Sequence, residues 1–94
     1  MVGDKIYLVQ QESNVDGEIF FNVVPCSTME KAKEVLEEEK NTILNESYHF
    51  RGRTPEELEE DFYVDEEEDG TYWYINDESD DYYEELKIVE KEIL

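Results

Sequence analysis

A long run of uncompensated acidic charge limits how this chain can fold. Residues 54–85 contain sixteen Asp or Glu residues and no Lys or Arg. Residues 1–49 carry ten acidic and four basic side chains, or −6, whereas residues 50–94 carry eighteen and four, or −14. Because like charges repel one another in a compact state, we expect the first half to hold the fold and the second half to present a specialised acidic surface.

The overall composition favours a folded domain over a disordered acidic tail. The 94 residues have a net charge of −20, but 38% of them are hydrophobic and 13% are aromatic. Disordered acidic segments are poor in aromatic residues. A chain of this length has room for one core, so we expect a single domain over residues 1–94.

Charge and cysteine content exclude several classes of protein. A surface this negative repels DNA, RNA and anionic membranes, so a direct nucleic-acid or membrane partner is not expected. Cys26 is the only cysteine, which excludes an intrachain disulfide and fits a reducing cytoplasm. The N-terminal residues do not resemble a signal peptide, and no apolar segment approaches the roughly 20 residues of a membrane span.

The first half of the chain predicts a hairpin followed by a helix. Residues 5–11 and 18–24 are rich in β-branched and aromatic residues, and the Asp16-Gly17 pair between them favours a tight turn. Pro25 is expected to end the second strand, because proline cannot donate to a strand ladder. Ser27 and Glu30 have the spacing of a capping box, so an amphipathic helix is expected over residues 28–46.

The second half predicts a short helix and three strands. Thr54, Pro55 and Glu57 are typical of a helix start, with a helical turn over residues 55–61. Strands are expected over residues 62–67, 71–76 and 82–94, with a turn at Asp69-Gly70. The order β-β-α-β-β-β predicts an α+β fold, with an antiparallel sheet of about four to five strands and one main helix packed on one face.

One acidic segment can be compared with a calcium-binding loop. Counted from Asp65, the segment places acids at positions 1, 3 and 5 of an EF-hand loop and Gly70 at position 6. Position 12 is Asn76, which cannot supply the bidentate carboxylate, and the flanks read as strands rather than helices. A second acidic loop, residues 77–81, lacks the glycine. We expect acidic turns that bind divalent cations only weakly, with no specific metal site and no cofactor.

The sequence carries no sign of an enzyme. A single Cys26 and a single His49 show no spacing that links them as a nucleophile and base, and one histidine does not make a zinc site. Paired carboxylates occur throughout, so their presence identifies no hydrolase. We expect a binding protein.

Two features suggest how such a protein would bind. Acids two apart on a strand lie about 6.6 Å apart and acids three or four apart on a helix about 5–6 Å apart, which approaches the charge density of a nucleic acid. In the strand at residues 71–76, Trp73 and Ile75 face one side and Tyr72 and Tyr74 the other. The tyrosine side is a candidate contact surface, because tyrosine is enriched at interfaces.

These features predict a partner and a set of contact residues. The partner is a basic, nucleic-acid-handling protein, and the chain itself is a monomer or a weak homodimer, since acidic edge strands oppose pairing. The predicted partner-binding residues are Glu66, Glu67, Glu68, Asp69, Tyr74, Asp77, Glu78, Asp80, Asp81 and Tyr82.

Three stretches also carry a resemblance: KIYLVQQ at the start, CSTMEKAKEVLEEE at the helix entry and ELKIVEKEIL at the end. Their arrangement resembles small acidic proteins of bacterial phages and mobile elements. In size and charge alone, the chain also resembles DNA-mimic proteins, including anti-CRISPR and anti-restriction inhibitors. This resemblance implies a cytoplasmic inhibitor that binds a host defence nuclease, such as a CRISPR effector or a restriction enzyme. The alternative is an interaction or immunity-type module of a phage or mobile element that uses the tyrosine-rich sheet face.

Overall fold

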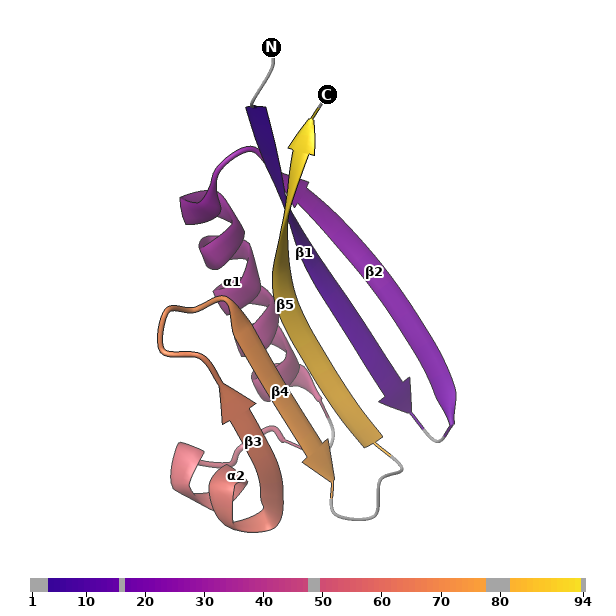
Figure 1. The fold of residues 1–94 in the computed structure, drawn as a ribbon. Helices are drawn as coiled ribbons and strands as arrows, with labels where there is room; N and C mark the ends of the chain where they lie inside the picture. The colour runs from indigo at the N-terminus through magenta and orange to yellow at the C-terminus, as the bar shows by residue number, and fades with distance from the viewer. Residues whose placement is uncertain (1–3, 16, 48–49, 78–81, 94) are drawn as a thin grey trace.

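The computed structural model of the chain describes residues 4–15, 17–47, 50–77 and 82–93, and it shows an α+β fold in which one antiparallel sheet carries one long helix (Figure 1). In chain order the elements are β1 (Asp4–Val15), β2 (Glu18–Cys26), α1 (Met29–Glu46), α2 (Pro55–Asp61), β3 (Phe62–Glu66), β4 (Tyr72–Asp77) and β5 (Tyr82–Ile93). The predicted fold class and element order are confirmed. No helix within the described ranges is long and apolar enough to cross a membrane.

The sheet has the strand order β2-β1-β5-β4-β3, with every neighbouring pair antiparallel. The last strand, β5, lies between β1 and β4 and joins the two hairpins into one sheet. Its pairing with β1 runs from Asp4↔Ile93 to Val15↔Tyr82. This arrangement leaves β2 and β3 as the two edges of the sheet.

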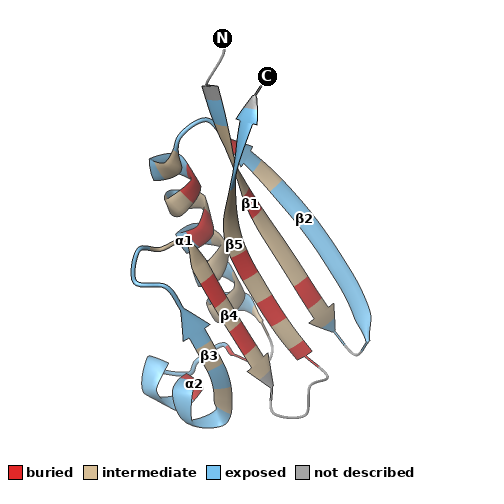
Figure 2. Cartoon of the chain, in the orientation of Figure 1, coloured by how far each residue is buried: buried red, intermediate tan, exposed pale blue. Residues whose placement is uncertain are grey.

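Helix α1 covers one face of the sheet and encloses the core. Its buried residues, Ala32 and Leu36, contribute to a core cluster with Val9, Trp73 and Leu86 from three central strands. Figure 2 shows buried residues concentrated on β4, β5, β1 and α1, whereas β2 is exposed along most of its length. The face of the sheet opposite α1 is called the open face here, because no described helix lies over it.

The start of α1 differs by one residue from the prediction. The N-cap is Thr28 and not Ser27, because the Thr28 side chain accepts a hydrogen bond from the Lys31 backbone N–H at 3.1 Å. Either hydroxyl is an acceptable cap, and the local sequence does not distinguish the two.

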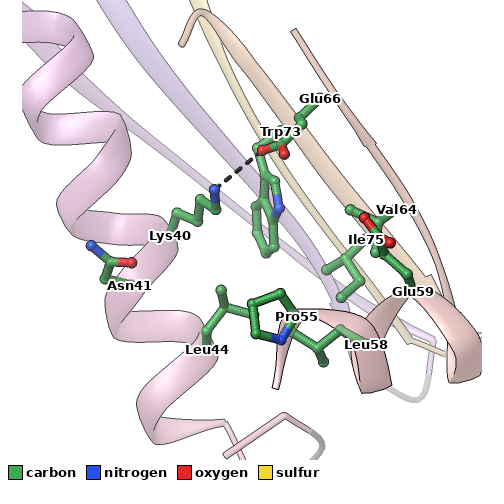
Figure 3. A pocket seen from close by; sticks show the side chains of 10 residues that line it. All are labelled: Lys40, Asn41, Leu44, Pro55, Leu58, Glu59, Val64, Glu66, Trp73 and Ile75. Carbon is green, nitrogen blue, oxygen red and sulfur yellow. Dashed lines mark hydrogen bonds and ion pairs between the residues drawn. The ribbon is translucent and has the colours of Figure 1, made fainter. Parts of the chain in front are cut away.

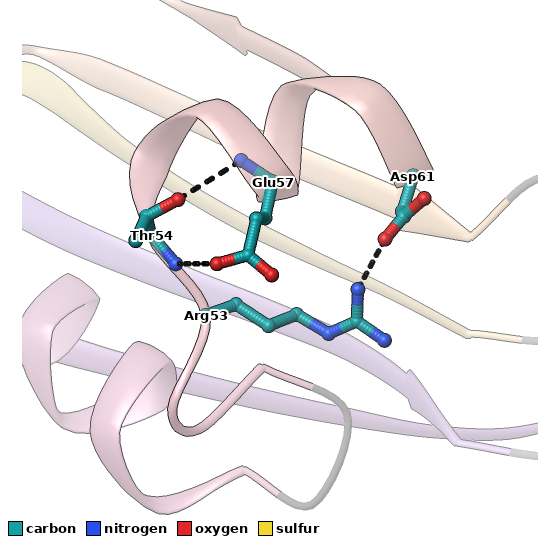
Figure 4. A network of polar contacts seen from close by, with 4 residues as sticks. All are labelled: Arg53, Thr54, Glu57 and Asp61. Carbon is teal, nitrogen blue, oxygen red and sulfur yellow. Dashed lines mark hydrogen bonds and ion pairs between the residues drawn. The ribbon is translucent and has the colours of Figure 1, made fainter.

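The start of α2 follows the prediction closely (Figure 4). Thr54 and Glu57 form a reciprocal capping box, in which each side chain accepts a hydrogen bond of 3.2 Å from the backbone N–H of the other. Pro55 occupies the first helical turn. The Arg53 guanidinium pairs with the Asp61 carboxylate at the far end of the helix, so one cation spans this short element.

The prediction that Pro25 ends the second strand is wrong. Strand β2 continues through Pro25 to Cys26, and Pro25 pairs in register with Leu8. Proline is tolerated there because β2 is an edge strand, on which an N–H that points away from the sheet has no ladder partner to lose.

Candidate protein-binding surface

The exposed acids gather along one edge of the sheet. We call this the acidic edge, and its members lie on α2, on β3 and in the turn between β3 and β4. All ten are exposed: Glu56, Glu57, Glu59, Glu60, Asp61, Asp65, Glu66, Glu67, Glu68 and Asp69. Helix α2 leads directly into β3, so the acids follow the edge from the helix at one end to the turn at the other.

Few cations compensate this edge. Lys40 of α1 pairs with Glu66 at 3.1 Å, and Arg53 pairs with Asp61. Among the described residues no other Lys or Arg forms an ion pair with a member of the acidic edge, which leaves eight carboxylates without one. The edge therefore presents dense negative charge to any molecule that approaches it.

The turn between β3 and β4 has a defined conformation. Asp69 accepts hydrogen bonds from the Thr71 backbone N–H at 3.1 Å and from the Thr71 hydroxyl at 2.6 Å. These bonds lower the pKa of the Asp69 carboxyl. Gly70 has φ +80°, a conformation that glycine adopts without steric cost. The side chains of Glu67 and Glu68 remain exposed on this fixed turn.

This turn does not have the architecture of an EF-hand. Strands flank it on both sides, whereas an EF-hand loop is flanked by helices. Within the described part of the chain, no group of three or more His, Cys, Asp or Glu side chains is arranged to hold a metal ion.

The structure brings together only some of the predicted contact residues. Glu66, Glu67, Glu68 and Asp69 lie together at the β3–β4 turn. Asp77 ends β4, opposite Phe62, and is therefore separated from that turn by the length of the strand, roughly 17 Å. The predicted residues Glu78, Asp80 and Asp81 lie outside the described residues.

Tyr74 lies on the open face, as the alternation of β4 predicts. Its ring is stacked on Tyr83 with centroids 6.0 Å apart, and it meets Tyr63 edge-on at 6.1 Å. We call the surface formed by Tyr63, Tyr72, Tyr74 and Tyr83 the tyrosine face. It spans β3, β4 and β5. Tyr63 is 61% exposed, so the face is accessible at its outer edge.

Two carboxylates on the open face adjoin the tyrosines, and sequence reasoning did not select them. Glu12 and Glu85 are direct neighbours in register on β1 and β5, a placement that is unfavourable for like charges. The Tyr83 hydroxyl donates to Glu12 at 2.6 Å, and the Tyr72 hydroxyl donates to Glu85 at 3.2 Å.

These tyrosine–carboxylate contacts affect the phenols. The hydrogen bond to Glu12 is the main cause that raises the pKa of Tyr83 to about 12. Burial, reinforced by Glu85, raises the pKa of Tyr72 to about 12. The sequence signal that could have identified Glu85 as a neighbour of the tyrosines is its position two residues after Tyr83, which places both side chains on the same face of β5.

The prediction that Tyr82 is a contact residue is wrong. Its side chain is only 6% exposed and points to the α1 side of the sheet, opposite to Tyr83. Its hydroxyl donates to Glu84 at 3.1 Å, and burial raises its pKa to about 12. Tyr82 therefore belongs to the core and cannot anchor a partner on the surface.

A pocket lies beside the acidic edge, between α1, α2 and the sheet (Figure 3). It encloses about 230 Å³. Trp73, Leu44 and Leu58 supply apolar walls, whereas Glu59 and the Lys40–Glu66 ion pair contribute polar groups to its lining. The arrangement combines an apolar interior with carboxylates.

Comparison with protein-family models, with curated proteins and with solved structures finds no match for this chain.

Proposed function

We propose that this chain is a stoichiometric inhibitor that mimics a nucleic acid and occupies the binding groove of a basic nucleic-acid-binding protein. The observation that carries the proposal is the acidic edge, where ten exposed carboxylates have only two ion-pair partners among the described residues. A host defence nuclease, such as a CRISPR effector or a restriction enzyme, is the kind of target expected, and the chain acts by binding rather than by catalysis.

The spacing of these charges supports the proposal. Carboxylates three or four residues apart on α2 lie about 5–6 Å from one another, and duplex DNA carries one charge per about 1.7 Å of its axis over two strands. A groove lined by Lys and Arg can therefore exchange its phosphate contacts for carboxylate contacts. For solubility alone, a net charge of magnitude about 2–8 suffices for a small domain.

The pocket beside the acidic edge adds a place for an anchor from the partner. A Lys or Arg side chain has an apolar stem and a cationic head. The walls formed by Trp73 and Leu44 suit the stem, and the carboxylates of Glu59 and Glu66 suit the head. An inserted arginine would compete with Lys40 for Glu66.

A competition experiment tests this function. The tagged protein is used to capture its target from host lysate at low salt, and the purified target is then titrated with duplex DNA and with NaCl. We expect DNA to displace the protein and binding to weaken as salt rises, because both ligands release counter-ions from the same groove. Binding that is indifferent to both DNA and salt would contradict the proposal.

A matched pair of variants identifies the surface. The test variant replaces Glu59, Glu60, Glu67 and Glu68 with Gln, and the control variant replaces four exposed acids of α1, Glu30, Glu34, Glu37 and Glu38, with Gln. Both variants lose the same charge. We expect target affinity to fall at least about tenfold in the first and much less in the second. Equal losses would mean that net charge, and not the acidic edge, governs binding.

The tyrosine face supports a second candidate, an interaction module that binds through the open side of the sheet. The supporting observation is the contact cluster of Tyr74 with Tyr63 and Tyr83 on a face that no described helix covers. In this case Tyr63→Ala and Tyr74→Ala should weaken binding more than the four acidic-edge substitutions do, because aromatic side chains carry much of the energy at interfaces. The opposite ranking would reject this candidate.

A further inference from the structure

Strand β2 is an exposed edge with an unusual surface. It is the outermost strand beside β1, and its only charged residue is Glu18 at its first position. Four large apolar side chains are exposed on it: Ile19 at 63%, Phe20 at 56%, Phe21 at 60% and Val23 at 37%. Figure 2 shows this exposed surface running along most of the strand.

The register indicates which backbone groups point away from the sheet. Antiparallel pairs alternate between hydrogen-bonded and non-hydrogen-bonded positions, and Pro25, opposite Leu8, has no N–H to give. The Pro25–Leu8 pair is therefore a non-hydrogen-bonded pair. The pattern repeats every two residues, so Val23, Phe21 and Ile19 also form non-hydrogen-bonded pairs with β1. The N–H and C=O groups of these last three residues face outward, unpaired within the described chain.

The other edge of the sheet is protected and β2 is not. Strand β3 has five residues, carries Asp65 and Glu66, and adjoins the acids of α2. Short length and charge are the usual devices that stop edge strands from pairing. Strand β2 is nine residues long, its one charge is Glu18 at the first position, and Pro25, another residue that hinders edge pairing, lies near its end. The expectation that acidic edges oppose pairing therefore applies to β3, which carries acids, and not to β2, which has only Glu18.

We propose that β2 pairs with β2 of a second copy of this chain, antiparallel and about a two-fold axis at Phe21, so that two five-stranded sheets become one continuous sheet. In this register Phe21 meets Phe21, and Ile19 meets Val23 of the other copy. Each pair exchanges two backbone hydrogen bonds. Pro25 falls outside these pairs. The Ile19, Phe21 and Val23 side chains of both copies form one cluster on the open face, whereas Phe20 lies on the opposite face of the strand.

A second copy is the occupant that the charge distribution favours. A strand with no charge beyond Glu18 at its first position fits a second copy of itself, and pairing at β2 places the two acidic edges at the far ends of the joined sheet. Within one copy β2 and β3 are four strand spacings apart, or roughly 19 Å. The acidic edges of the two copies are farther apart than this distance, which already exceeds the Debye length of about 8 Å at physiological salt. The repulsion between the two acidic edges is therefore largely screened at that salt concentration.

The size of the contact indicates a modest affinity. A nine-residue edge is about 30 Å long. A contact along one strand lies at the lower end of the size range for specific interfaces, about 1,200 Å² in total. We therefore expect a dissociation constant of roughly 1–100 μM and a reversible dimer.

Analytical ultracentrifugation tests the dimer with purified protein at about 1 μM to about 1 mM. We expect dimerisation to tighten as NaCl rises from about 0.01 M to about 0.15 M, because the Debye length falls from about 30 Å to about 8 Å. This trend is opposite to that expected for binding of the acidic edge to a basic target, so the two proposals can fail independently. A protein that stays monomeric at every concentration and salt would overturn the dimer.

Two matched substitutions locate the interface. Phe21→Lys places a charge on β2, and Tyr63→Lys places the same charge on β3, at the opposite edge of the sheet. Both side chains lie on the open face and are similarly exposed, Phe21 at 60% and Tyr63 at 61%. We expect the first to raise the dissociation constant at least about tenfold and the second to leave it within about threefold. Equal effects, or a dimer that Phe21→Lys does not weaken, would overturn the assignment.

A cross-link tests the register without relying on affinity. Hydrogen-bonded antiparallel partners have Cα atoms about 5.5 Å apart, within the range that a disulfide spans. Phe21→Cys should therefore form a disulfide-linked dimer on mild oxidation, while Tyr63→Cys should not; the native Cys26 is buried. Absence of the Phe21→Cys cross-link in a protein that still dimerises would overturn the proposed axis.

Discussion

The Ser13 hydroxyl donates a 2.6 Å hydrogen bond to the Glu84 carboxylate, which joins β1 to β5 inside the structure. Both residues are buried, with exposures of 9% and 6%. The second carboxylate oxygen of Glu84 accepts from Tyr82. One acid of the acid-rich segment is thus removed from the surface and used to hold the central pair of strands.

Ser13→Ala should destabilise the protein by about 1–3 kcal/mol, because it leaves a buried carboxylate oxygen without its donor. Denaturant unfolding followed by circular dichroism measures this loss. Ser27→Ala removes the same hydroxyl from an exposed site and should change stability by no more than about 0.5 kcal/mol. Similar stabilities for the two variants would show that Glu84 does not depend on Ser13.

Thr28→Ala should destabilise the protein by about 1 kcal/mol, because the Lys31 N–H at the start of α1 loses its acceptor. Thr28→Ser keeps the hydroxyl and should restore most of that stability. The measurement is again the free energy of unfolding in denaturant. If Ser27→Ala proved the more costly change, the cap would lie at Ser27, as the sequence alone suggests.

Three tyrosines should ionise late in an alkaline titration. The pKa values of Tyr72, Tyr82 and Tyr83 are raised from 10.0 to about 12 in the folded protein. Near-ultraviolet absorbance should show this late group in the native protein, whereas in denaturant all tyrosines should titrate at about pH 10. Complete ionisation of the native protein near 10 would contradict the assigned contacts.

These shifts also affect stability. Because the folded pKa values exceed the unfolded value, their contribution is fully present below pH 10.0 and is lost as pH rises through about 12. Alkaline unfolding in that window is therefore expected. Tyr82→Phe should remove part of this pH dependence, since a phenylalanine has no proton to release.

The acidic edge should cost the protein stability at low salt. Replacing Glu59, Glu60, Glu67 and Glu68 with Gln should raise the melting temperature in dilute buffer, because self-repulsion falls. The gain should shrink as NaCl rises and screens the charges that remain in the wild type. Thermal melts at several salt concentrations test this, and a melting temperature lowered by the substitutions at every concentration would contradict it.

Local sequence patterns predicted much of the fold. The Thr54, Pro55 and Glu57 pattern placed the start of α2, and its capping box is present. The alternation in β4 correctly separated Trp73 and Ile75, which are buried, from Tyr74 on the open face. These features depend on contacts between residues close in sequence, so short segments contain the information.

Other features depended on distant contacts and were missed. Alternation separates Tyr82 from Tyr83, but it does not say which of the two meets α1. Phe50 lies in a turn outside every helix and strand, yet it is fully buried against Phe62 and Tyr82, and no local pattern marks it as a core residue. In each case the partner lies more than ten residues away, and its identity depends on how the whole chain packs.

By itself, the sequence determined the amount of charge, its concentration in residues 54–85, the element types and the alternation of each strand. Only the tertiary structure decided that β5 lies between β1 and β4, which leaves β3, part of the acidic edge, at one side of the sheet and β2, with Glu18 as its one charge, at the other. The physical reason is that strand order depends on hydrogen bonds between residues as far apart as Asp4 and Ile93, and these pairings leave no local mark in the chain.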